Sequence, residues 1–581
     1  MILPVATLSL LSALTVAPVP EIRQPSSSPT LAVANILPAN TPIVGLINTK
    51  GKTWAGLNRF YLFQTASQAV SQFLPSVFEL DYAKDIESWL GEQVVFAFLP
   101  KVGSTPASVD SQFLILAPVK DDTRLQPLLE KLKADRSRVK EREYKGITIL
   151  ELNAPQVAPP TNTLPSSVRR LKSSSNPNLV KPDRSKKKSG IAIATFPGYV
   201  VTSITAEAIE QLIDASEEKA TLAQNSQFQK TLQQSQSDRV LFTIHENLAT
   251  LVPLISDISK DPNLPFPVFG ADTINLDEVK EYGTVNGFVS IQPEGLRFQV
   301  NAYREALKSK QSKNATKKTG TMLDQMPGAT YSALTGRNLN QQWQQLAKGF
   351  STKPQFKEYL ETFRKFVRTS TGLDWDKDIL GWMDGEYGFF LFPTKGGLFN
   401  FIAGSNLNMG VGVAVQTSNR AAADATLKKL NELIQSSLMG GVVVNTHNIQ
   451  GQPVTSWDIG GNSSQSLLAY SWVNNNTVIV TTGFGAIADL VPQPYVLLPS
   501  TYNFQTATNS LPYPNQGYFY VNTGSFLSWL YSFLPSVFND QNLQPWKPVI
   551  GSVYSISATT STTAEREQFD ILLVLAPSRK K

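Results

Sequence analysis

Two stretches of this chain repeat each other. Residues 81–100 (DYAKDIESWLGEQVVFAFLP) and residues 374–393 (DWDKDILGWMDGEYGFFLFP) align without gaps and are identical at seven of twenty positions. Ordinary amino-acid usage would give about one identity. An internal repeat limits the architecture more than any other feature of a sequence, because each copy must form a similar structural unit. The sequence therefore predicts a duplicated chain.

The register of the repeat extends beyond this segment. Upstream, Pro38 and Pro327 each precede an apolar strand, and Trp54 and Trp343 each lie 16 residues after that proline. Downstream, each copy continues with a strand, an amphipathic helix, a hairpin, a short helix and two closing strands. These elements are expected at 113–119, 125–132, 191–204, 208–213 and 284–303 in the first copy, and at 410–416, 423–434, 467–482, 486–491 and 551–575 in the second.

This order predicts two homologous domains at residues 36–307 and 322–577, joined by a Lys-rich linker at 308–321 and preceded by residues 1–35. Alternation of Val, Ile, Phe and Tyr with polar residues is typical of antiparallel strands that place one face against a core. The helices supply the second layer. We therefore expect an α+β fold of two tandem homologous domains, each a mainly antiparallel sheet with helices packed on one face.

The net charge of +6 is concentrated in two segments. Residues 155–188 carry eight basic side chains against one acidic side chain, and residues 308–318 carry five lysines, which leaves −6 for the remainder of the chain. Both segments are rich in Ser, Pro, Asn and Lys and lack apolar periodicity, which is typical of linkers. Because the remainder is acidic, we expect no nucleic-acid binding.

The basic segment at 155–188 has two interpretations. It is either a solubilising insertion in the first domain, or a contact for an anionic membrane surface, a polyanionic wall polymer or an acidic partner. In the second interpretation the contact residues are Arg169, Arg170, Lys172, Lys181, Arg184, Lys186, Lys187 and Lys188.

The N-terminus begins with an uncharged, mostly apolar run at residues 2–19. The run is slightly shorter than the roughly 20 residues that span a bilayer, and its prolines also favour an export signal over a permanent anchor. No Lys or Arg precedes it, so the signal is atypical or the true start lies upstream. Cleavage, membrane anchoring and a buried N-terminal segment stay open as alternatives. A lipoprotein anchor is excluded because the chain has no cysteine.

The scarcity of cysteine and histidine excludes several kinds of chemistry. The chain has no Cys and only two histidines, His245 and His447, so disulfide scaffolds, Cys-based zinc sites, iron–sulfur clusters and thiol catalysis are ruled out. The two histidines do not correspond between the copies, which favours structural or surface roles over that of a catalytic base. We expect no catalytic residue, metal or cofactor to be identifiable. Paired carboxylates at glycosidase spacing stay open, because that spacing depends on the fold.

Three acidic residues in the second copy resemble the start of a calcium loop. Asp374, Asp376 and Asp378 alternate as the first three ligands of such a loop do. The sixth position, which requires Gly, is Ile379, and Glu386 comes one place too late for the last ligand. The pattern therefore lacks the glycine and the correctly placed last ligand that a calcium loop requires.

Helix capping explains the same motif better. The first copy has Ala83 at the place of Asp376, so a metal site would be lost there. Asp374 or Asp378, and Asp81 or Asp85 in the first copy, can accept backbone N–H bonds at the start of a short helix. We therefore predict a capping role for these carboxylates.

Two further motifs have a functional and a structural interpretation. Gly483, Gly485 and Ala488 match a dinucleotide fingerprint, but Pro492 shortens the helix that follows and the first copy has no glycine there. We therefore do not expect nucleotide binding. The aromatic run at 526–538 (FLSWLYSFLPSVF) could face a membrane or a partner, but at helical spacing we expect it in the core.

These segments together resemble a known family. The opening at 37–49, the segment at 81–98, the strand and helix that follow, and the second copies of all three are similar to the largely cyanobacterial domain-of-unknown-function 3352 family. The likeness covers nearly everything after residue 35. No activity or site residue is established for the family, so none is carried over. The resemblance implies an exported protein of the periplasm or thylakoid lumen, either free or anchored through its N-terminal segment.

Three hypotheses of function follow. The first is an extracytoplasmic, non-enzymatic binding or scaffold protein whose partner is a protein or a cell-envelope polymer. The second is a hydrolase that acts on a cell-wall or extracellular polymer through Asp/Glu pairs. The third is a peripheral membrane protein that the basic segment at 155–188 tethers to anionic lipids.

Overall fold

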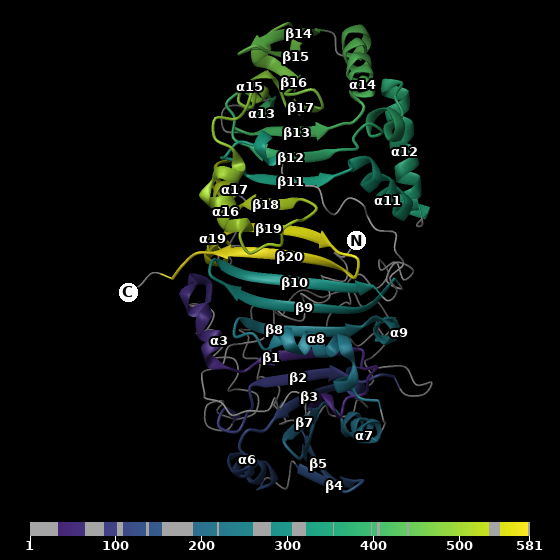
Figure 1. Ribbon diagram of the computed structural model, residues 1–581, viewed down its shortest axis with the longest axis vertical. Helices are drawn as coiled ribbons and strands as arrows, with labels where there is room; N and C mark the ends of the chain where they lie inside the picture. Colours follow the sequence, from purple (N-terminus) through teal and green to yellow (C-terminus); the bar gives the residue numbers. More distant parts are fainter. Residues whose placement is uncertain are drawn as a thin grey trace, which may run out of the picture. The chain divides into compact units, whose positions relative to one another are not determined.

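The computed structural model describes thirteen segments of the chain, which divide into two compact units (Figure 1). The described residues are 33–63, 86–101, 109–134, 139–153, 190–217, 220–258, 281–304, 321–351, 354–396, 398–403, 407–438, 441–533 and 547–578. Unit 1 comprises Met1–Gly56 and Ser67–Phe288, and unit 2 comprises Leu57–Ala66 and Val289–Lys581. Three predicted segments lie outside the described residues: the apolar run at 2–19, the basic segment at 155–188 with all eight of its candidate contact residues, and the lysines at 308–318.

Unit 1 contains an antiparallel sheet with strand order β8-β1-β2-β3-β7-β6-β5-β4. The strands are β8 (Val240–Asn247), β1 (Ile43–Asn48), β2 (Gln93–Phe98), β3 (Phe113–Pro118), β7 (Tyr199–Ser203), β6 (Gly190–Phe196), β5 (Ile147–Asn153) and β4 (Val139–Tyr144). The predicted hairpin at 191–204 is confirmed as β6 and β7. Gly198 in its turn has φ +83°, a conformation that favours glycine.

Unit 2 contains an antiparallel sheet with strand order β10-β20-β19-β18-β11-β12-β13-β17-β16-β15-β14. The strands are β10 (Gly295–Arg304), β20 (Arg566–Leu575), β19 (Val553–Thr562), β18 (Tyr518–Asn522), β11 (Ser332–Arg337), β12 (Glu386–Phe392), β13 (Gly410–Gln416), β17 (Thr477–Thr481), β16 (Ser466–Trp472), β15 (Gln452–Ile459) and β14 (Val442–Ile449). The division between the units falls within β9 (Tyr282–Gln292).

Eight strands of each unit follow the same order. The series β8-β1-β2-β3-β7-β6-β5-β4 of unit 1 corresponds, strand for strand, to β18-β11-β12-β13-β17-β16-β15-β14 of unit 2. Small details repeat as well: Pro38 bridges Thr221 as Pro327 bridges Leu497. The predicted repetition of element order is therefore confirmed, while the assignment of two homologous tandem domains stays a prediction.

Helices of unit 1 cover both faces of its sheet. The helices are α3 (Gly51–Ala55), α5 (Val109–Gln112), α6 (Asp122–Ala134), α7 (Ala206–Ala215), α8 (Ser226–Ser235) and α9 (Leu248–Ile258). Val201 of β7 belongs to the core beneath α7 and α8, whereas its neighbour Val200 belongs to the cluster beneath α6. Successive residues of a strand point to opposite faces, so α6 lies on the face opposite α7 and α8.

Unit 2 repeats this two-sided packing. Its helices are α11 (Leu339–Ser351), α12 (Pro354–Thr371), the π-helix η7 (Trp375–Ile379), α13 (Leu398–Ala403), α14 (Arg420–Leu433), α15 (Phe484–Ala488), α16 (Tyr502–Thr508), α17 (Thr523–Phe533) and α19 (Lys547–Gly551). Val478 and Ile479, adjacent in β17, are both fully buried, one in the cluster beneath α14 and the other in the main core.

The α+β class and the antiparallel sheets are confirmed, but the prediction of helices on one face is wrong. The prediction assumed that each strand alternates between apolar and polar residues. The central strands instead carry apolar residues at consecutive positions, as in Val200-Val201 and Val478-Ile479, so both of their faces require cover. In the described part of the chain, no helix is long and apolar enough to cross a membrane.

Candidate functional site

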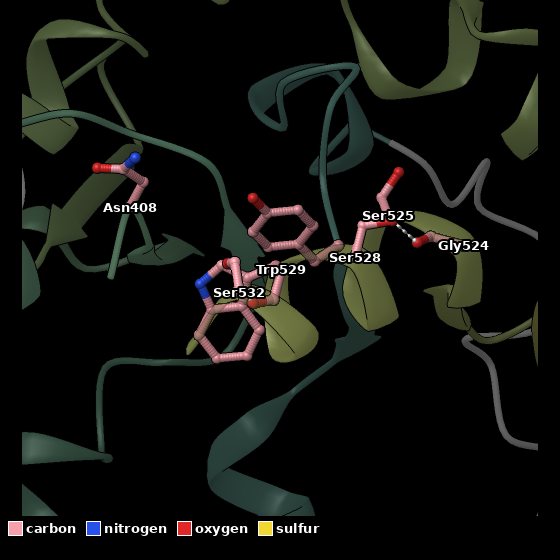
Figure 2. A pocket seen from close by; sticks show the side chains of 7 residues that line it. Asn408, Gly524, Ser525, Ser528, Trp529 and Ser532 are labelled. Carbon is pink, nitrogen blue, oxygen red and sulfur yellow. Dashed lines mark hydrogen bonds between the residues drawn. The ribbon is translucent and has the colours of Figure 1, made fainter. Parts of the chain in front are cut away.

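A groove in unit 2 lies beside helix α17 (Figure 2). Its volume is about 470 Å³, within the range of roughly 300–1,000 Å³ that is usual for small-molecule sites. The residues that line it are Tyr331, Asn408, Gly524, Ser525, Ser528, Trp529 and Ser532. They come from three places: the residue before β11, the segment before β13, and one face of α17.

Helix α17 presents its serines to the groove because of how the helix begins and repeats. The side-chain oxygen of Asn522, the last residue of β18, accepts a hydrogen bond from the backbone N–H of Ser525 at 3.1 Å, which fixes the first turn. Ser525, Ser528 and Ser532 then recur at helical spacing and share one face. The result is a row of hydroxyl groups along the groove.

The serine hydroxyls are oriented by the helix itself. The hydroxyl of Ser528 donates to the carbonyl of Gly524 at 2.8 Å, the dashed line in Figure 2, and that of Ser532 donates to the carbonyl of Trp529 at 2.6 Å. A serine oxygen whose proton is engaged in this way still has lone pairs to accept hydrogen bonds. The row therefore favours a ligand that carries hydroxyl or amide donors.

The rings of Tyr331 and Trp529 form the other part of the groove, and Phe526 packs beside Trp529. The ring centroids of Tyr331 and Trp529 are 6.0 Å apart, and those of Trp529 and Phe526 are 5.6 Å apart. The backbone of Tyr331 is held between strands, since its N–H donates to Leu391 and its carbonyl accepts from Asn522. Burial raises the pKa of the Tyr331 phenol. The rings offer a rigid apolar surface next to the polar serine row.

The lining residues include no carboxylate, imidazole or formal charge. Their one titratable group is the phenol of Tyr331, and its raised pKa keeps it protonated at neutral pH. A general acid or base that works near neutral pH needs a pKa close to that range. The described groove can therefore bind a neutral polar ligand, but its lining does not supply proton transfer.

The prediction that the aromatic run at 526–538 lies in the core is wrong for the described part of that run. Phe526 and Trp529 are only half-buried, and Tyr531 is 38% exposed. The polar signal was present in the sequence, because Ser525, Ser528 and Ser532 alternate at helical spacing with the aromatic residues. Serines at this spacing indicate an exposed helix face.

The acidic motif of the second copy caps a helix, as predicted. One carboxylate oxygen of Asp374 accepts hydrogen bonds from the backbone N–H groups of Asp376 and Lys377, each at 3.1 Å. The hydrogen bond from Lys377 and the neighbouring Arg368 guanidinium hold the Asp374 pKa below its ordinary value. The candidate caps of the first copy, Asp81 and Asp85, lie outside the described residues.

The other two aspartates of this motif are engaged separately. Asp376 binds Arg364 at 2.7 Å and accepts a hydrogen bond from the indole of Trp343 at 2.6 Å. Asp378 accepts the backbone N–H of Asp374 at 2.7 Å. Within the part of the chain that the structure describes, no three His, Cys, Asp or Glu side chains are grouped so that they could hold a metal ion.

A Ser–His–Asp cluster lies on the β14–β15 hairpin. The hydroxyl of Ser456 donates to the buried carboxylate of Asp458 at 2.8 Å, and Nε2 of His447 lies 3.1 Å from the same hydroxyl and 3.5 Å from that carboxylate. In a catalytic triad the serine and the carboxylate contact different nitrogens of the imidazole. Here both contact Nε2 and Ser456 is fully buried, so the cluster is structural.

The remaining sequence candidates also have structural roles. His245 is buried in unit 1, where its Nδ1 lies 2.9 Å from Oδ1 of Asn286, and burial lowers its pKa to about 4. Gly483 has φ +97° before the five-residue helix α15. A Cβ atom on Gly485 would lie 2.4 Å from Cα of Gly396, so this glycine permits close backbone packing.

Comparisons with known proteins give a family but no activity. No curated protein matches this chain. Crystal forms I and III of TP0453 each align with 48% of this chain and 80% of their own, with 10% identity and a TM-score of 0.23. Crystal form IV of TP0453 aligns with 48% of this chain and 83% of its own, with 8% identity and the same TM-score. A TM-score of 0.23 is too low to support an inference about the fold or function of this chain.

A family model described as "Protein of unknown function (DUF3352)" matches residues 3–575, which is nearly the whole chain. The chain therefore belongs to the DUF3352 family.

Proposed function

We propose that this protein is a non-enzymatic binding protein of the cell envelope, and that the α17 groove holds part of a neutral polysaccharide. The composition of the groove carries this proposal: two aromatic rings lie beside a row of hydroxyl groups and an amide, without any formal charge. A sugar ring has apolar C–H faces and a polar rim, so it matches such a surface on both counts.

The two alternative functions, a hydrolase and a protein tethered to the membrane by its basic segment, have less support. A hydrolase would need carboxylates at the ligand, and the residues that line this groove contribute none. Tethering by the basic segment at 155–188 depends on residues outside the described part of the chain and stays a prediction. Location outside the cytoplasm, in the periplasm or thylakoid lumen, rests on the signal-like run at 2–19 and is part of the proposal.

Binding of soluble N-acetylglucosamine oligomers tests the proposal. Titration calorimetry should detect binding to the full-length protein, and Trp529→Ala should weaken it at least tenfold, about 1.4 kcal/mol. Ser528→Ala should weaken it less, because it removes a single acceptor. Trp472→Ala is the matched control, since Trp472 is a half-buried tryptophan of β16 that does not line the groove.

Two results would contradict the proposal. Equal binding by the Trp529→Ala and Trp472→Ala variants would exclude the groove. Shortening of the oligomers during long incubation, detected by mass spectrometry, would contradict a non-enzymatic role.

A further inference from the structure

Helices α11 and α12 carry an apolar surface that the core of unit 2 does not use. We name it the aromatic hairpin surface and define it as Leu346, Phe350, Phe356, Tyr359, Phe363 and Phe366. Their exposed fractions are 49%, 37%, 48%, 74%, 39% and 67%, in that order. Scattered exposed apolar residues are normal in proteins, but six large ones on two adjacent helices form a patch that indicates an interaction site.

The apolar face of α12 is wider than the part that the core covers. Leu360 and Val367, seven residues apart at one edge of this face, are buried and hold the helix to unit 2. Phe356, Tyr359, Phe363 and Phe366 continue the face away from that edge, at three- and four-residue steps. Exposure rises across it and is highest at Tyr359 and Phe366.

The π-helix η7 lies against α12. Arg364 binds Asp376 in a half-buried pair, and the more exposed Arg368 binds Asp374. Trp375 of η7 contacts Phe363 of α12, with ring centroids 5.0 Å apart.

Ring contacts extend from η7 across to α11. The centroids of Trp343 in α11 and Trp375 are 5.8 Å apart, and those of Phe350 and Phe356 are 5.7 Å apart. The π-helix η7 thus packs against both α11 and α12, and the rings of Phe350 and Phe356 pack α11 against α12.

The charge of the two helices differs from that of the rest of the chain. The two helices carry five basic residues against two acidic ones, but Arg364 and Arg368 are engaged with Asp376 and Asp374 of η7. Lys348, Lys357 and Lys365 then stand against Glu358 and Glu361, a net charge of +1 in a part of the sequence whose net charge is −6. Lys357 and Arg368 lie on the opposite side of α12 from Tyr359 and Phe366, and Lys365 lies between the two sides.

We propose that the aromatic hairpin surface docks this protein on an anionic lipid bilayer. An amphipathic helix with Phe, Tyr and Leu on one face and Lys and Arg on the other is typical of segments that lie in the membrane interface. Tyrosine places its ring among acyl chains and its hydroxyl among headgroups. Anionic headgroups attract the positive charge of the hairpin. Two copies of the same surface would instead bring two positive charges together, which disfavours a dimer.

This proposal does not depend on the polysaccharide groove, because the two sites share no residue. It also differs from tethering by the segment at 155–188, because its apolar contacts persist at high salt, whereas a purely electrostatic tether weakens.

Vesicle sedimentation with full-length protein tests the proposal. Vesicles of equal parts phosphatidylglycerol and phosphatidylcholine should bind the protein, and vesicles of phosphatidylcholine alone should bind it at least tenfold more weakly. The variant Tyr359→Ser/Phe366→Ser should lose at least tenfold in partitioning to the anionic vesicles. These two side chains are the most exposed of the surface, so the variant should keep the wild-type melting temperature. The variant Tyr359→Trp/Phe366→Trp, which keeps an aromatic ring at both positions, should bind the anionic vesicles as the wild type does.

Control variants separate the alternatives. Tyr495→Ser/Tyr502→Ser removes two highly exposed tyrosines outside the hairpin and should bind like wild type. Deletion of 155–188 should leave binding that still depends on Tyr359 and Phe366. Equal binding by the hairpin and control variants would overturn the proposal. A concentration-dependent dimer, seen by light scattering and abolished by Tyr359→Ser/Phe366→Ser without any vesicle binding, would also overturn it and assign the surface to a second copy.

Discussion

The helix after the eighth strand of each unit has the same place in the fold but a different exposure. In unit 1, α9 follows β8 and buries Leu248, Leu251 and Leu254. In unit 2, α17 follows β18, and its Trp529 lines a groove instead of entering the core. The shared strand order thus fixes where the helix lies, while the side chains decide whether it stabilises the unit or forms a surface.

The connection after the first strand shows the same division. Unit 1 follows β1 with the short, largely buried helix α3, as far as that connection is described. Unit 2 follows β11 with α11 and α12 and their exposed aromatic residues. Binding residues commonly lie on connections that a rigid framework positions. The comparison indicates that the strands are the common framework and that the connections of unit 2 carry the two surfaces proposed to bind ligands.

The largest expected effect comes from matched core substitutions. Ile209 of α7 and Ile487 of α15 are both fully buried, each in its own unit. Replacement by Ala should cost each unit about 2–5 kcal/mol, because it leaves a cavity. Calorimetry should show two unfolding transitions, one lowered by Ile209→Ala and the other by Ile487→Ala. If both variants lower one shared transition equally, the two units unfold together and not independently.

Acid should destabilise unit 1 through His245. Its pKa is about 4 in the folded protein, against about 6.5 in an unfolded chain. Its contribution is therefore fully present above pH 6.5 and is lost as the pH falls toward 4, by about 3 kcal/mol. His245 pairs with Val44 where Tyr520 pairs with Ala333 in unit 2. Tyr520, with a pKa of about 12, does not titrate in this range.

The measurement is the pH dependence of the two transitions between pH 4 and 7. His245→Gln should remove the pH dependence of the unit 1 transition, whatever its effect at neutral pH. An unchanged slope in this variant would show that other groups cause the acid sensitivity.

Exchange of one connection tests how far the shared framework tolerates variation. Asn153 at the end of β5 pairs with Gly190 at the start of β6, so the ends of the connection are adjacent. Replacing residues 154–189 with the equivalent residues 460–465 of unit 2 should raise the stability of unit 1 by about 1.5 kcal/mol, because a shorter loop costs less entropy to close. Chemical denaturation measures the change. A large loss of stability would mean that the connection contributes to the fold.

The smallest effect is expected at the helix cap. Asp374→Ala should cost unit 2 about 1 kcal/mol, because two backbone N–H groups of η7 lose their acceptor. Asp374→Asn should cost less, since the amide oxygen can still accept and the exposed pair with Arg368 contributes little. Thermal unfolding of the two variants measures the difference. Equal losses would assign the effect to the charge instead of the cap.

The repeat was predictable because apolar periodicity and proline spacing are local signals. The strands and the hairpins at 191–204 and 467–482 followed from them, and the cap at Asp374 followed from the repeated acidic motif. Two-sided helix packing did not, because Val200-Val201 fits a strand covered on one face or on both. The groove was missed because aromatic residues at helical spacing predict burial, although Ser525, Ser528 and Ser532 at the same spacing indicate an exposed face.

Hydrogen–deuterium exchange of the full-length protein shows whether ligands are bound by the connections of unit 2, while the strand framework that it shares with unit 1 stays unaffected. Addition of anionic vesicles should protect residues 339–371, and addition of N-acetylglucosamine oligomers should protect residues 523–533. We expect no matching protection at α7, α8 or α9 of unit 1. Protection confined to those helices, with none in unit 2, would contradict binding by the connections of unit 2.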